Sequence, residues 1–272
     1  MGGVAELLSI LRRNKTMDLR EKRIIVTGAS RGLGLLCAQA MAKQGARLVL
    51  IARSQDKLDE AKDSLRSSRK HLVIAADLTN MEELQNAIKK AKDFLGDVDV
   101  VLHAAGGGLG FREPLIQPQE LDMLYKLNVG AAVEINRIVV PDMIKKGSGN
   151  IVHIGSSASN EAIGSVGYNT VKAALAGYVR SIGREMANTG VIITAALPGA
   201  FSAPENSWMR LAKEKPDVVD KFVKEKLPRG RLGLGEEIVP LILLLCSSEA
   251  SMMPGCCVPI DAGESRSFER LD

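Results

Sequence analysis

Two residues able to transfer a proton, Tyr168 and Lys172, stand four positions apart in the helical pattern of residues 166–186. Side chains at this spacing project from one face of an α-helix, so the phenol and the ammonium should lie close together. A free phenol has a pKa of about 10, and a nearby positive charge stabilises the phenolate and lowers that value. The pair is therefore predicted to exchange a proton with a bound oxygen atom.

Polar residues elsewhere could assist this pair, which on its own is a common chance spacing. Ser156 and Ser157 follow the apolar run 150–155, where either hydroxyl could bind the same oxygen. The alternative for them is a serine-rich loop without chemistry. Asn128 lies in an apolar helical stretch that its side chain weakens, which predicts a partner outside the helix, a kink or a buried packing role.

The stretch 27–34, Thr-Gly-Ala-Ser-Arg-Gly-Leu-Gly, connects an apolar run to a helical pattern. Glycines at these places permit a tight turn and bring backbone N–H groups close to a pyrophosphate, while the helix N-terminus adds its positive dipole. In this strand-turn-helix context the motif predicts a bound dinucleotide; a plain structural turn is the alternative.

Short apolar runs and amphipathic helical patterns alternate along nearly the whole chain. The expected strands are 23–28, 47–52, 71–75, 98–103, 150–155 and 191–197, and the expected helices are 33–44, 55–65, 81–94, 120–146 and 166–186. Strands that are apolar throughout and joined by helices predict an α/β fold, a doubly wound parallel β-sheet of the Rossmann type. At 272 residues the chain suits one such domain.

Two segments depart from this alternation. Residues 1–17 form an amphipathic N-terminal extension before the domain at 18–272. Residues 200–231 are highly charged, contain the only tryptophan, Trp208, and are expected to form a lid over a substrate site.

Composition excludes several classes of partner. The net charge of +4 is spread along the chain without a basic block, so no nucleic acid is expected. The four cysteines and three histidines lack zinc-ligand spacing, so no metal is expected. The apolar run 238–246 is too short to span a bilayer, and no signal peptide is visible, so the chain is expected to be a cytoplasmic protein without a membrane partner.

Taken in order, these motifs resemble the short-chain dehydrogenase/reductase family, single-domain branch, over about residues 20–265. The resemblance implies an NAD(P)(H)-dependent oxidoreductase that interconverts a ketone and a secondary alcohol by hydride transfer, with Tyr168 as general acid/base and Lys172 beside it. It also implies that Asn128 holds a water near the lysine and that a serine binds the substrate oxygen. The family's usual serine-to-tyrosine separation falls on Gly155, so alignment on the strand gives Ser156, with Ser157 as the alternative.

The end of the second strand informs the choice of cofactor. Folds that select NAD commonly place a carboxylate there for the ribose 2′-hydroxyl, whereas this strand ends in Ala52 and Arg53. Arg53 and Arg31 could clamp a 2′-phosphate with their guanidinium groups, or be solvated surface residues. The sequence thus favours NADP(H), and NAD(H) stays possible.

The resemblance also implies contacts to the rest of the cofactor. The full expected set is Gly28, Ser30, Arg31, Gly32, Leu33, Gly34, Arg53, Asp77, Leu78, Ala105, Gly106, Tyr168, Lys172, Pro198 and Gly199. Within it, Asp77 would meet the adenine, or else belong to a helix N-cap region. His103 replaces an asparagine usual in the family and is expected to be a hydrogen-bonded structural residue.

The substrate and the assembly are implied only by resemblance. Residues 154–172 and the lid are similar to reductases of bacterial surface-sugar or flagellin-modification pathways, which implies a sugar or sugar-nucleotide-like carbonyl or alcohol substrate. A 3-ketoacyl-type reductase and a non-catalytic dinucleotide-binding scaffold are the alternatives. Family members commonly assemble through the helices at 120–146 and 166–187, which implies a homodimer or homotetramer.

Overall fold

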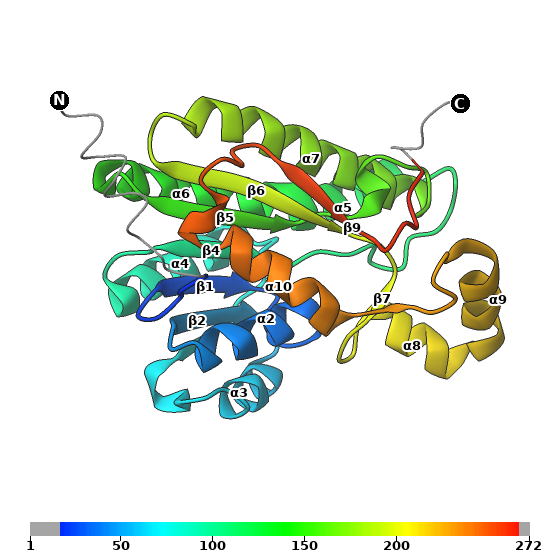
Figure 1. Cartoon of the computed structure of the whole chain (residues 1–272), viewed down its shortest axis with the longest axis horizontal. Coiled ribbons are helices and arrows are strands. Elements are labelled where there is room, and N and C mark those ends of the chain that lie inside the picture. The colour runs from blue at the N-terminus through cyan, green and yellow to red at the C-terminus, as the bar shows by residue number, and fades with distance from the viewer. Residues whose placement is uncertain (1–16, 267–272) are drawn as a thin grey trace.

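The computed structural model describes residues 17–266, so all of the expected extension at 1–17 except its last residue lies outside the described residues, as do residues 267–272. Seven parallel strands form one sheet in the order β3-β2-β1-β4-β5-β6-β9 (Figure 1). Their bounds are β1 (Arg23–Thr27), β2 (Arg47–Ala52), β3 (Leu72–Ala75), β4 (Val100–His103), β5 (Gly149–Ile154), β6 (Val191–Pro198) and β9 (Cys257–Ile260). The predicted doubly wound parallel sheet is confirmed, and the six expected strands agree with the structure to within two residues at their ends.

Helices cover both faces of this sheet because strands that are apolar throughout must be buried on both sides. One face carries α2 (Gly32–Lys43), α3 (Gln55–Asp63) and α10 (Gly235–Leu245), and the other carries α4 (Met81–Leu95), α6 (Ala131–Lys146) and α7 (Val166–Met186). The two cores are aliphatic, with Ile24 and Leu50 facing the first group and Ile25 and Val49 facing the second.

The strand order reverses between β1 and β4, which pair with each other although β2 and β3 lie between them in the chain. At such a switch point the connections leave in opposite directions, and a crevice opens beyond the carboxyl ends of the two strands. This crevice is where the turn after β1 and the loop after β4 meet.

The insertion after β6 forms a separate helical hairpin at one end of the molecule (Figure 1). It contains α8 (Ser207–Glu214) and α9 (Pro216–Lys226), with the Trp208 ring 4.5 Å from that of Phe222. Its two ends are joined by a small parallel pair, β7 (Phe201–Ser202) with β8 (Gly233–Leu234). In the part of the chain from 17 to 266, no helix has the length and apolarity to cross a membrane.

A charged cluster at the amino ends of β1 and β4 is expected to stabilise the fold. Asp99 accepts hydrogen bonds from Arg23 Nε at 2.8 Å and from Lys146 Nζ at 2.6 Å. Burial acts to raise the pKa of Asp99, but these partners hold it well below its usual range.

Replacement of that carboxylate, Asp99→Asn, is therefore expected to lower the free energy of unfolding by about 2 kcal/mol at pH 7. Because a depressed pKa stabilises the fold only above the unfolded-state value, the difference should shrink as the pH falls below about 4. Urea unfolding of both proteins at pH 7 and at pH 3.5 measures it, and a constant difference would contradict the assignment to charge.

Candidate active site

The glycine-rich turn after β1 is packed tightly against the end of β4. Gly28 has φ +64°, and a Cβ there would lie 2.6 Å from the backbone nitrogen of Ala105. A Cβ on Gly34 would lie 2.4 Å from the carbonyl oxygen of Gly28. Thr27 Oγ1 accepts a hydrogen bond from Ala105 N at 3.2 Å, which ties the turn to the loop after β4. Only glycine permits this close approach, so the turn and the crevice are built together.

The N-terminus of α2, which follows this turn, has no internal anion. Its N-cap residue Arg31 makes no side-chain capping bond, and the first turn contains no acidic residue. The first amides of a helix have no acceptor within the helix and carry the positive end of its dipole. A turn that must be glycine, followed by an uncapped helix start, fits a pyrophosphate group.

Arg31 and Arg53, the expected 2′-phosphate contacts, lie within electrostatic reach of each other. The pKa of Arg31 is lowered chiefly by burial, then by the charge of Arg210, while Glu205 opposes the shift and Arg53 adds to it. Asp77 lies at the same end, since Arg53 contributes to the lowering of the Asp77 pKa that hydrogen bonds from Thr79 cause.

The neighbours of Asp77 separate its two interpretations. Asp77 Oδ1 accepts from the backbone N–H and the hydroxyl of Thr79, whereas the N-cap of α4 is Asn80, whose side chain binds Glu82 N and Glu83 N. Asp77 is thus not the cap itself. Leu78, next to it, is buried.

Tyr168, Ser156 and Lys172 come together beyond the end of β5. Tyr168 lies in the first turn of α7, and a side-chain hydrogen bond links it to Ser156. Lys172 Nζ is 5.7 Å from the centroid of the Tyr168 ring and donates a hydrogen bond to Ile154 O at 2.9 Å. Tyr168 and Lys172 therefore lie beside Ser156 at the end of β5, as the sequence predicts.

Burial dominates the ionisation of this pair. It raises the pKa of Tyr168, and the hydrogen bond with Ser156 opposes the rise only in part. Burial also lowers the pKa of Lys172 to about 8. The expectation that the Tyr168 pKa is lowered is therefore wrong for the protein alone, because desolvation raises it. At neutral pH Tyr168 holds its proton, and Lys172 is mostly charged.

The two adjacent serines have different partners. Ser156 contacts Tyr168, and its Oγ also accepts from Ala158 N at 3.2 Å. Ser157 is buried and donates to Pro198 O at 3.2 Å. The structure therefore brings Ser156, and not Ser157, to the phenol. Ser157 instead holds the end of β6.

The turn after β6, Pro198-Gly199, lies between Ser157 and the last strand of the sheet. Gly199 N donates to Ile260 O at 3.3 Å. A Cβ on Gly199 would lie 2.7 Å from Cβ of Asp261, so the chain passes there only as glycine. Pro198 and Gly199, both expected to contact the cofactor, are thus fixed from both sides.

Asn128 interrupts the helix that the sequence predicts over 120–146. That helix divides into α5 (Pro118–Tyr125), a π-helical turn (Lys126–Gly130) and α6. Asn128 Nδ2 donates to Leu124 O at 2.9 Å, while its Oδ1 accepts from Gly107 N at 3.0 Å. A π-turn of this kind is frequent at functional sites. The expected partner outside the helix is Gly107, and Asn128 is also buried.

Asn128 also reaches the lysine. A Cβ on Gly106 would lie 2.8 Å from Asn128 Oδ1 and 3.4 Å from Lys172 Nζ, so these three residues meet at one point. Asn128 also lines a small cavity together with Thr27 and His103.

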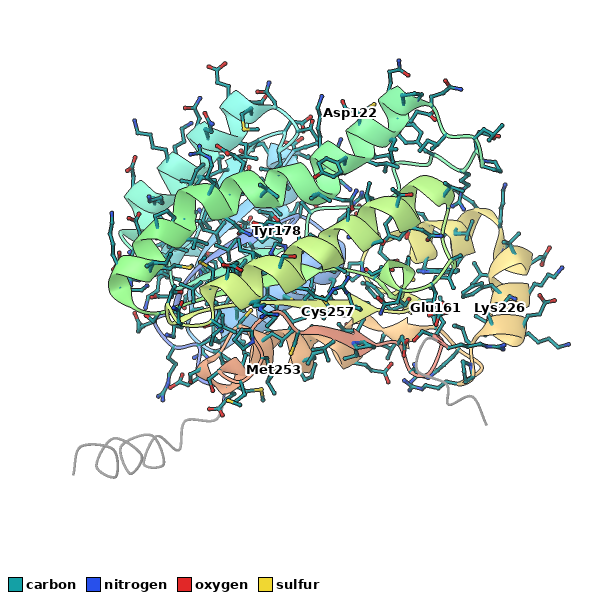
Figure 2. All side chains as sticks on the ribbon, turned by 90° about the horizontal axis from the view of Figure 1, so that it is seen from above. Asp122, Glu161, Tyr178, Lys226, Met253 and Cys257 are labelled. Carbon is teal, nitrogen blue, oxygen red and sulfur yellow. The ribbon has the colours of Figure 1, made fainter. Side chains whose placement is uncertain are left out.

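His103 belongs to a buried network rather than to the proton-transfer group. Its Nε2 is 2.8 Å from Asn136 Oδ1, and its ring stacks on His153 with centroids 4.5 Å apart. Burial lowers the pKa of His103 to about 4, so the ring is neutral. Asn136 also donates to the hydroxyl of Tyr178, which Figure 2 shows on α7. The structural role expected for His103 is confirmed.

Two residues at this end of the molecule are not predicted from the sequence. Lys57 in the first turn of α3 and Glu205 in the lid form an ion pair next to Arg31. Lys57 could have been suspected from its position just beyond Arg53, whereas nothing in the sequence marks Glu205. Among residues 17–266 no group of three or more His, Cys, Asp or Glu side chains is placed to bind a metal ion.

A seven-stranded doubly wound sheet with this turn and this Ser-Tyr-Lys group defines a class of nucleotide-binding oxidoreductases. The chain belongs to the short-chain dehydrogenase family, whose model matches residues 22–214. It is 32% identical over 222 residues, 76% of this chain and 77% of the relative, to the ketoacyl reductase HetN of a Nostoc species.

Solved structures agree with this assignment. L-sorbose reductase from Gluconobacter frateurii, complexed with NADPH and L-sorbose, superposes with a TM-score of 0.84 at 27% identity and covers 94% of this chain and 100% of its own. A 7α-hydroxysteroid dehydrogenase complexed with NADH superposes with a TM-score of 0.83 at 26% identity, covering 92% and 97%. The protein is thus an enzyme of an oxidoreductase family whose members differ in substrate and cofactor.

Proposed function

We propose that this protein is an NADP(H)-dependent oxidoreductase that interconverts a ketone and a secondary alcohol. The observation that carries the proposal is the convergence of Ser156, Tyr168 and the buried Lys172 at the crevice where the glycine-rich turn meets β4. A binding scaffold needs the turn but has no use for this polar group, which supports catalysis over a non-catalytic role.

Each residue of the group has a task in ketone reduction. The hydroxyls of Ser156 and Tyr168, already linked, bind the carbonyl oxygen. Because burial keeps Tyr168 protonated, it can donate its proton to that oxygen as the carbonyl carbon is reduced. Lys172, charged below about pH 8, stabilises the phenolate that is left. Bound NADPH supplies the hydride.

Asn128 supports Lys172 from the other side, by a fixed set of bonds. Its amide binds Gly107 through both atoms and meets Gly106 and Lys172. We propose that Asn128 keeps the loop after β4 open at the position where the lysine must approach the ligand. Gly106, at this position, has no side chain that would block the lysine.

The preference for NADP(H) is supported by the charge at the end of β2. Arg31 and Arg53 lie near each other, and β2 ends in Ala52 and Arg53 without a carboxylate for a ribose hydroxyl. Guanidinium groups bind phosphate oxygens with matched geometry. The structure of sorbose reductase contains NADPH, which agrees with this preference. The structure of the steroid dehydrogenase contains NADH, so the fold accepts either cofactor.

Replacement of Arg53 by alanine should weaken NADPH binding about tenfold, because one charge-assisted contact to the 2′-phosphate is lost. NADH binding should change less than about twofold, because NADH has no such phosphate. Titration of nucleotide fluorescence measures both, with Arg69→Ala, an exposed arginine in the 3₁₀ turn between α3 and β3, as the matched control. Equal effects on the two nucleotides would refute the assignment.

A sugar-like polyhydroxy ketone is the proposed substrate. Arg229 and Arg231 both bind Glu237, and Arg210 binds the backbone of Glu205, so these lid arginines have partners within the chain. This favours a neutral sugar over a nucleotide-linked one, and the likeness to L-sorbose reductase supports it. The ketoacyl reductase relative keeps a 3-ketoacyl substrate as the second candidate.

NADPH oxidation against ketohexoses, nucleotide-linked keto sugars and 3-ketoacyl thioesters separates these substrates. The highest kcat/KM is expected for a ketohexose. A preference for thioesters would select the second candidate. Tight NADPH binding with no turnover of any ketone would overturn the catalytic proposal.

A further inference from the structure

The lid segment 203–206 lies directly over the phosphate-binding turn. Pro204 O accepts a hydrogen bond from Gly32 N at 2.7 Å, at the first residue of α2. Asn206 fixes this arrangement, since its side chain donates to Phe201 O at 2.7 Å and its backbone N–H donates to Ala203 O at 3.0 Å. An amide at the helix start, where a pyrophosphate would lie, is thus used by the protein's own carbonyl group.

Glu205, the next residue, has its carboxylate among cations. It pairs with Lys57 of α3 and lies close enough to Arg31 to influence its pKa. The hydrogen bond from Lys57 is the largest cause that lowers the pKa of Glu205, followed by the charge of Lys57. The φ of Glu205 is +53°, in the left-handed region that glutamate rarely adopts. The backbone is therefore held in an uncommon conformation at the residue that brings an anion to this place.

Three cations gather here from separate elements: Arg31 from the turn, Arg53 from the end of β2, and Lys57 from α3. The positive charges of Arg210, in the lid, and of Arg53 both lower the pKa of Arg31. Like charges gathered in this way favour an anion among them, and Glu205 brings one to Arg31 and Lys57, while Asp77 acts on Arg53. A 2′-phosphate carries more charge and more acceptor oxygens than a carboxylate, and would bind the same cations.

We propose that Glu205 is an intramolecular competitor of the cofactor's 2′-phosphate and holds the lid against the turn until that phosphate displaces it. The inference rests on the proposed use of NADP(H). NAD(H) has no group to displace the carboxylate, so only a nucleotide with a 2′-phosphate releases the lid. Because the coupling is reciprocal, the nucleotide bound also determines the position of the lid.

The test uses two redox-inactive probes, 2′,5′-ADP and 5′-ADP, with calorimetry on the intact chain. Glu205→Gln removes the competing charge, so 2′,5′-ADP should bind about fivefold tighter, as expected for removal of one exposed ion pair. Binding of 5′-ADP should change less than about twofold. Glu214→Gln, the same change on an exposed residue of α8, is the control and should alter neither.

Emission of Trp208, the only tryptophan, gives a second readout that does not depend on activity. It lies on α8, close in the chain to Glu205, so 2′,5′-ADP should change its emission in the native protein and 5′-ADP should not. In Glu205→Gln the ligand-free emission should already resemble the 2′,5′-ADP complex.

The outcomes distinguish this inference from the proposed function. If native protein prefers 2′,5′-ADP but Glu205→Gln leaves that preference and the Trp208 signal unchanged, the competitor role is overturned while the NADP(H) proposal stands. If the two probes bind equally to the native protein and to Glu205→Gln, the NADP(H) proposal itself is overturned.

Discussion

Removal of one oxygen atom, by Tyr168→Phe, is expected to lower turnover about 1000-fold, as for loss of a general acid. NADPH affinity should stay within about twofold of the native value, because the ring keeps its place. That ring packs closely against the chain, since a Cβ on Gly164 would lie 2.9 Å from Tyr168 Cδ1 and one on Gly108 3.8 Å from Cδ2. Single-turnover NADPH oxidation and fluorescence titration measure the two effects.

Tyr178→Phe is the matched control, since it makes the same change on the same helix. Tyr178 accepts a hydrogen bond from Asn136 and lies edge-on to His153, in the buried network of His103. Its loss should cost about 1 kcal/mol of stability and change turnover less than about threefold. If Tyr168→Phe keeps more than about a tenth of native turnover, Tyr168 is not the proton donor.

Much of this arrangement follows from local sequence. The period of the apolar residues determines which segments are strands and which are helices, and continuously apolar strands require cover on both faces. A parallel sheet then places all the strand ends on one edge, so residues after β1, β4 and β5 must meet there. For this reason the sequence alone predicts that Gly28, Ser156 and Tyr168 lie close together.

Other features depend on contacts between distant segments, which local patterns do not contain. Ser156 and Ser157 are alike in sequence, and only the position of Pro198 O separates them. Lys57 and Glu205 are 148 residues apart, so their pairing depends on how the lid folds back.

The ionisation of Tyr168 is another feature that local sequence patterns do not predict. The direction of the Tyr168 pKa shift depends on how much of the phenol is removed from water, and helical spacing says nothing about that. The spacing correctly predicts which residues are neighbours. It does not predict the balance between charge and desolvation, which here keeps the tyrosine protonated.

Lys172→Met should produce the second largest loss, about 100-fold in kcat/KM at pH 7, since it removes the charge that stabilises the phenolate. In the native protein the pKa of Lys172 is lowered to about 8 by burial, so the charge is present below that pH and is lost above it. We expect native kcat/KM for NADPH, which reports the free enzyme, to fall as the pH rises through about 8. The same decline should be missing from Lys172→Met.

The stability of this variant should change in the opposite direction to its activity. Because the folded-state pKa of Lys172 lies below that of the unfolded chain, the unfolded chain binds the proton more tightly, and the buried charge destabilises the fold at every pH below about 8. Methionine fills a similar volume without that charge, so Lys172→Met is expected to raise the free energy of unfolding by about 2 kcal/mol at pH 7. Urea denaturation at pH 7 measures it. A variant that lost stability together with activity would show that Lys172 supports the structure through its hydrogen bond to Ile154 O, and would count against a role for its charge in proton transfer.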